Sequence, residues 1–129
     1  MTKGDWMDLT VLERRKYNLL SETMDLSRQL GEAMDRNDDV SLRLVIAMRQ
    51  EPILGLEEVK QAIARKLESL SQEDQQRVSE LAGGAAPEGG EETVYFNQAG
   101  SARRLLERVI ELDRRLNRRM AGENSFYGK

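Results

Sequence analysis

The residues of this chain that could do acid–base chemistry are carboxylates. They occur as the neighbouring pairs Asp38 and Asp39, Glu57 and Glu58, and Glu91 and Glu92, and the chain contains no His or Cys. Paired carboxylates act as general acid and base only where a partly buried cleft moves their pKa values apart. Their predicted positions, in a turn, on a helix surface and in a glycine-rich stretch, offer no such cleft. The sequence therefore predicts a protein that is not an enzyme.

Metal and phosphate sites also lack their usual signals. Without His and Cys, the common zinc ligands and the Glu-x-x-His pairs of four-helix carboxylate sites are missing. The glycine-rich run GGAAPEGG has no Lys-Ser/Thr after it, and no predicted strand comes before it, so it does not fit a phosphate-binding loop. We expect neither a cofactor nor a metal ion.

Composition indicates a helical protein. The 129 residues suit one domain, and aromatic residues make up only 5% of them, so the apolar content is mostly Leu, Val, Ile and Met. That composition is typical of long helices that meet along seams. No apolar run approaches the roughly 20 residues that span a bilayer, and MTKGDWMDL lacks the basic start and apolar core of a signal peptide. We expect a cytoplasmic protein without membrane insertion.

Two long helices are predicted in the first half of the chain. The first carries apolar residues at spacings of three and four from Leu9 to Met34, and at this length it spans roughly 40 Å, so it must run beside other long helices. Residues 35–39, DRNDD, favour a turn and an N-cap, which predicts a tight helical hairpin. The second helix starts near Val40 and meets Pro52, which predicts either a kink near Met48 to Pro52 or two helices divided at Glu51. The remaining apolar positions of this second segment are Leu44, Val45, Leu56, Val59, Ile63, Leu67 and Leu70.

A third, short helix and a linker follow. Ser71 is a predicted N-cap with Asp74 three residues later, Val78 and Leu81 form a short apolar edge, and glycines end the segment at residues 83–84. We divide the chain into a helical hairpin with this short helix (1–82), a flexible glycine-rich linker (83–100), an amphipathic C-terminal helix (101–121) and a tail (122–129). The linker's apolar cluster, residues 94–96, either staples the linker to the bundle or forms an exposed docking patch. The predicted fold class is all-α, an elongated antiparallel hairpin or bundle of three to four helices.

The C-terminal helix has one apolar stripe and many arginines. Residues 101–129 carry a net charge of +4, against −4 for residues 1–82 and −3 for residues 83–100. The protein as a whole is acidic and this helix contains no aromatic residue, which argues against nucleic acid as a partner and against membrane-surface binding. The stripe either closes the bundle or covers another chain. Its residues are Leu105, Val109, Leu112, Leu116 and Met120.

Three stretches together carry a resemblance to a known family. They are AMDRNDDVSLRLVIAMRQ at the first turn, PILGLEEVKQAIARKLESL in the second helix, and RRLLERVIELDRRLNRRM near the end, followed by Tyr127 and Gly128. This layout, over most of the chain, resembles the flagellar export chaperones of the FlgN type, with the related FliT group behind them.

The resemblance implies a small cytoplasmic flagellar chaperone. Such a protein would bind the C-terminal helical segment of a hook-filament junction (hook-associated) or cap protein and deliver it to the export gate. It implies that the stripe faces the client, that Arg108 and Arg115 help to choose the register, and that Phe126 and Tyr127 dock on an export gate component. The alternative is a generic helical scaffold or regulatory adaptor that binds partners by coiled-coil packing, and either role is compatible with a homodimer.

Overall fold

The computed structural model describes the backbone of residues 1–127 and the side chains of residues 1–122. Four helices and no strands occur in this part of the chain: α1 (Lys3–Asp35), α2 (Asp39–Glu68), α3 (Gln72–Ala82) and α4 (Gly90–Tyr127). The prediction of an all-α helical bundle is confirmed.

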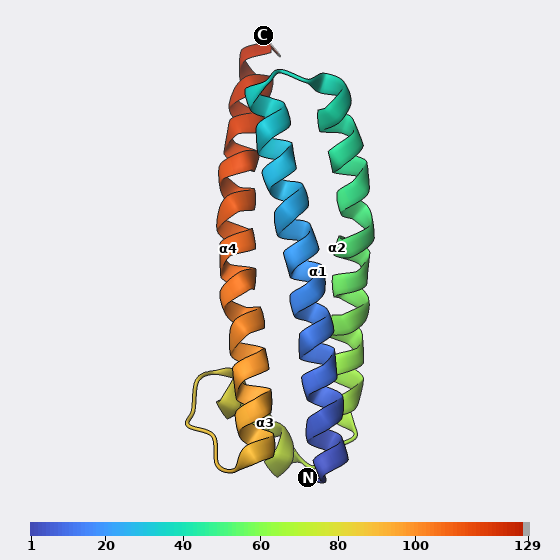
Figure 1. Cartoon of the computed structure of the whole chain (residues 1–129), viewed down its shortest axis with the longest axis vertical. Coiled ribbons are helices and arrows are strands. Elements are labelled where there is room, and N and C mark those ends of the chain that lie inside the picture. Colours follow the sequence, from blue (N-terminus) through green and yellow to red (C-terminus); the bar gives the residue numbers. More distant parts are fainter. Residues whose placement is uncertain (128–129) are drawn as a thin grey trace.

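The three long helices lie side by side, with α1 between α2 and α4 (Figure 1). α1 packs against both of the other long helices, and α3 packs against α4. The short α3 lies at the end of the bundle where the chain begins, whereas α4 ends beside the turn between α1 and α2 (Figure 1). The molecule is therefore elongated, as the length of the first predicted helix requires.

The core consists of three apolar clusters along α1. At the N-terminal end, α1 meets α3 and the start of α4; in the middle, it meets α4; near the hairpin turn, α1, α2 and α4 come together. Burying a large aliphatic side chain contributes about 1.5–3 kcal/mol, so these seams account for most of the favourable packing. Their buried members are Trp6, Leu9, Val78, Leu81, Tyr95 and Ala99; Leu20, Leu105 and Val109; and Leu26, Leu30, Met34, Val45 and Leu116.

The predicted turns and caps are present. Asn37 adopts a positive φ of 53°, a conformation that Asn tolerates better than most residues, and it reverses the chain after α1. The Asp38 carboxylate then accepts a hydrogen bond from the Ser41 backbone N–H at 3.1 Å, which caps α2. Ser71 caps α3 in the same way, by accepting from the Asp74 N–H at 3.1 Å. Local sequence thus sets the ends of these helices.

α2 is one continuous helix through Pro52. This excludes the alternative of two helices divided at Glu51. The Pro52 ring is buried against the bundle, and Gly55, one turn later, has its Cα so close to Leu19 of α1 that a Cβ there would lie 3.1 Å from a Leu19 methyl group. The absence of a side chain at Gly55 lets the two helices approach.

The start of the last helix needs correction. α4 begins at Gly90 rather than at Ser101, so the segment between helices is residues 83–89 instead of the predicted 83–100. The Trp6 and Tyr95 rings pack with their centroids 5.6 Å apart, and Ala99 is buried in the same cluster. Arg77 of α3 also pairs with Glu92 at 2.6 Å. These contacts stabilise eleven residues of helix that the glycine-rich composition did not predict.

The core assignment predicts a contrast between two leucines. Leu30→Ala removes a fully buried side chain and should lower the free energy of unfolding by about 2–5 kcal/mol. Leu44→Ala, at an exposed position of α2, should change it by about 0.5 kcal/mol or less. Urea denaturation followed by circular dichroism measures both values, and equal losses would contradict this core.

Candidate partner-binding surfaces

The apolar stripe of α4, which was predicted to face a client, packs against α1. Leu105, Val109 and Leu116 are buried, and Leu112 and Met120 are half-buried at the edge of the same seam. Leu105 and Val109 pack with Leu20, whereas Leu116 packs with residues of α1 and α2. In this arrangement the stripe closes the bundle, which is one of the two roles predicted for it. It could contact another chain only if α4 separated from α1.

Four other residues of α4 were predicted to belong to the site. Two of them are exposed, and the side chains of the other two lie outside those that the structure describes. Arg108 and Arg115 are exposed on α4. Arg119, one turn after Arg115, pairs with Asp35 at the end of α1 at 2.7 Å. The side chains of Phe126 and Tyr127 lie outside those that the structure describes.

A polar cluster sets the register of the three long helices. The Asp113 carboxylate of α4 accepts a hydrogen bond from Ser27 Oγ of α1 at 3.0 Å and from Arg49 Nη2 of α2 at 2.9 Å. Ser27 is fully buried and Arg49 is half-buried, so the ion pair is screened less than a surface pair. Because both partners of Asp113 come from other helices, sliding α4 along α1 would leave buried polar groups unpaired.

α2 carries a row of exposed apolar side chains, which we call the outer row: Val40, Leu44 and Met48. Their exposed fractions are 80%, 59% and 48%. Spacings of four residues place them on one side of the helix, whereas the buried residues Val45 and Pro52 lie on another. Sequence reasoning counted Leu44 and Met48 with Val45 as one apolar set. The i, i+4, i+8 spacing, distinct from the seven-residue spacing of the core positions, is the signal that separates them.

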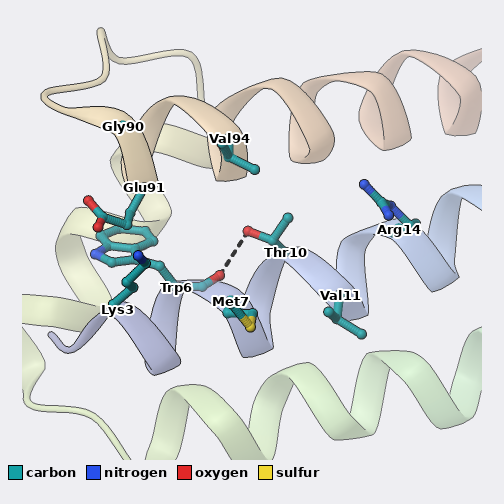
Figure 2. A pocket seen from close by; sticks show the side chains of 9 residues that line it. All are labelled: Lys3, Trp6, Met7, Thr10, Val11, Arg14, Gly90, Glu91 and Val94. Carbon is teal, nitrogen blue, oxygen red and sulfur yellow. Dashed lines mark hydrogen bonds between the residues drawn. The ribbon is translucent and has the colours of Figure 1, made fainter.

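A first groove, the N-terminal groove, runs between the beginnings of α1 and α4. Figure 2 shows Val94 of α4 above Thr10 of α1, with the Trp6 ring beside Glu91 at one end and Arg14 at the other. The groove has a volume of about 490 Å³. Thr10 Oγ1 donates to the Trp6 carbonyl at 2.8 Å, so its hydroxyl is already satisfied. Of the predicted apolar cluster 94–96, only Val94 is exposed, whereas Tyr95 holds the helix start to the bundle.

A second groove, the Glu13 groove, lies between α1, α2 and α4. Its volume is about 540 Å³. Apolar side chains from all three helices line it, and charged side chains stand among them: Glu13 and Lys16 of α1, and Glu57 and Lys60 of α2. Its apolar lining residues are Leu20, Ile53, Leu56, Ile63 and Leu106.

Glu13 is the unusual member of this lining. It is only 7% exposed, and within the described residues its carboxylate pairs with no other side chain, although its oxygens are not fully cut off from solvent. Burial raises the pKa of the Glu13 carboxyl, and the charge of Lys16 opposes that rise only in part. Burial, together with the Glu13 charge, also raises the pKa of the Tyr95 hydroxyl. The two groups therefore share one poorly solvated region at the N-terminal half of the bundle.

The described residues hold no group of three or more acidic, His or Cys side chains arranged to bind a metal ion. Within the same residues, none of the helices is both long and apolar enough to cross a membrane.

Comparisons of the chain with models of protein families, with curated proteins and with solved structures found no match. The surfaces described above are therefore interpreted from their geometry and chemistry.

The raised pKa of Glu13 predicts a pH-dependent effect on stability. Because the folded state holds this proton at a higher pH than the unfolded chain does, the Glu13 contribution to the free energy of unfolding falls as pH rises through that range. Glu13→Gln keeps the shape and cannot ionise. The stability of Glu13→Gln relative to the wild type should therefore increase as the pH rises above about 4.5, the ordinary pKa of a glutamate.

Urea titrations of both proteins at several pH values test this prediction. Lys16, Glu57, Lys60 and Tyr95 face the same region and are present in both proteins, so the difference between the two stability curves reports the removal of the Glu13 carboxyl. A stability difference that is constant with pH would show that Glu13 is solvated or paired in solution. Glu57→Gln, at an exposed position of the same groove, is the matched control.

Proposed function

We propose that this chain is a partner-binding helical protein and, following the family resemblance, a cytoplasmic chaperone of flagellar protein export. Its client would be the C-terminal helix of a hook-filament junction or cap subunit, and it would hand that client to a component of the export gate. The observation that carries the binding role is the outer row on α2. Three consecutive turns of a long helix present Val40, Leu44 and Met48 to solvent.

An amphipathic client helix suits this row. Side chains at i, i+4 and i+8 form a straight ridge, and a client's own apolar stripe can pack along it. The flexible side chain of methionine adapts to irregular partner surfaces. Single exposed apolar residues are common on proteins, whereas a continuous row of them marks an interaction surface. Leu54, also exposed, lies further along α2. Covering the row would keep a client helix from aggregating before export.

The proposal places the client on α2 and leaves α4 in the bundle. The stripe of Leu105, Val109 and Leu116 already has a partner in α1, so recruiting it would require breaking the core. Arg108 and Arg115 are exposed on α4 and would serve as a charged outer surface. The role of Phe126 and Tyr127 at the export gate remains part of the proposal.

The outer row predicts a specific loss of binding. Leu44→Glu puts a charge in the middle of the row and should weaken binding of a hook-associated C-terminal peptide by about tenfold or more. Ile110→Glu is the control, because Ile110 is also an exposed apolar residue, at 40%, but lies on α4 outside both grooves. Isothermal titration calorimetry gives the affinities, and circular dichroism confirms that both variants fold.

Three outcomes are informative. Loss in Leu44→Glu alone supports the assignment. Equal affinity of wild type and Leu44→Glu would remove the outer row from the client site. If the wild type binds neither hook-associated nor cap peptides, the flagellar assignment fails, and a partner captured by the outer row from another source would favour the helical adaptor.

A further inference from the structure

The Glu13 groove contains a buried acid without a counter-ion. Glu13 lies on α1 where α4 and α2 flank it, and it is more than nine-tenths buried. The charge of Lys16, about one turn further along α1, acts on Glu13, but the two side chains do not form an ion pair. Burying a carboxylate without a partner is costly. If position 13 contributed only packing, Leu or Met would stabilise the fold more than Glu does.

The remainder of the lining is complementary to a cation on an aliphatic stem. Leu20, Leu56 and Leu106 come from three different helices and supply apolar surface next to the carboxylate. Lysine and arginine side chains cover such surface with their methylene groups while the charged end reaches an acid. The other charged residues, Lys16, Glu57 and Lys60, are more exposed than Glu13 and stand at the edge. Glu13 is therefore the most deeply buried charge of the lining.

We propose that the Glu13 groove is a docking site for a partner protein segment that inserts one arginine or lysine beside Glu13 and lays flanking apolar residues on Leu20, Leu56 and Leu106. A volume of about 540 Å³ holds a few side chains, which fits one inserted residue and its neighbours, and not a whole helix. The proposal does not depend on the flagellar assignment. The Glu13 groove and the outer row also use different residues of α2. Ile53 and Leu56 line the groove, and no residue of the outer row does.

The inserted cation would offset the free-energy cost of burying the Glu13 carboxylate. In the free protein, burial takes part of the water from the Glu13 carboxylate and no other side chain pairs with it. With a guanidinium beside it, the same group would form a charge-assisted hydrogen bond in a poorly solvated place. A neutral group of the same shape gains packing only. Binding should therefore depend strongly on the charge of the inserted side chain. A pair with Glu13 should contribute more than an ion pair on the protein surface, where such pairs contribute little.

A pair of peptides tests the charge directly. The probe is a fluorescein-labelled, helix-forming peptide of about 15 residues, made of Ala and Gln, with one central arginine between two leucines one turn away on each side. The control peptide has citrulline, the neutral isostere, in place of arginine. Fluorescence anisotropy with the full-length protein should show about tenfold tighter binding of the arginine peptide.

Two protein variants complete the design. Glu13→Gln should bind both peptides equally, with the affinity that the wild type has for the citrulline peptide. Lys16→Met removes a competing cation near Glu13, so it should keep or increase the preference for arginine. Both variants are expected to fold, and circular dichroism checks this.

Several results would overturn the proposal. Equal binding of the two peptides by the wild type, no binding of either, or an arginine preference that survives Glu13→Gln would each do so. Binding of hexylammonium but of neither peptide would assign the groove to a small amphiphilic cation. A wild-type dimer that Glu13→Gln dissociates, measured by sedimentation, would assign it to a second copy of the chain.

Discussion

α1 packs against two long helices at once, and this double contact organises the molecule. Its residues must satisfy α4 on one side and α2 on another, which explains why its buried set includes small residues as well as leucines. Gly31 is so close to Leu116 of α4 that a Cβ would come within 3.3 Å of it, and Ser27 is fully buried against Asp113. A helix that serves two seams leaves its neighbours free on their outer faces. The surfaces available to partners therefore lie on α2, on the arginine face of α4 and in the grooves between helices.

Polar contacts at the two ends of the bundle hold these seams in register. Near the hairpin turn, Asp113 joins Ser27 and Arg49. At the other end, Lys66 of α2 binds Asp5 of α1 at 2.8 Å, and this hydrogen bond, with that from the Thr2 N–H, lowers the pKa of Asp5 to about 2. A lowered acid pKa means that this stabilisation is present above about pH 4 and is lost as the pH falls toward 2. Between the ends lies the Glu13 groove, where a buried charge has no such partner. The contrast between the ion pairs near the ends and the unpaired acid between them is why the groove is a candidate site.

The sequence predicted what depends on local pattern and short-range chemistry. The all-α class, the turn at residues 35–39 and the caps Asp38 and Ser71 follow from spacing and from side chains that bond to nearby backbone. Two features depended on distant contacts and could not be predicted in the same way. Glycines at 89–90 suggested a mobile segment, but Tyr95 packs on Trp6, 89 residues earlier, and this contact stabilises a helix that begins at Gly90. The stripe from Leu105 to Met120 required a partner, and the pattern could not distinguish α1 from another chain.

The central claim is that the protein keeps the α4 stripe inside its own core and offers other surfaces to partners. Hydrogen exchange of the free protein, followed by mass spectrometry, tests it most directly. The amides of α4 residues 105–116 should exchange as slowly as those of α1 residues 20–30, because both lie in the same seams and open only when the bundle unfolds. Fast exchange of residues 105–116 while α1 and α2 stay protected would contradict the claim, because α4 would then leave the bundle and expose its stripe.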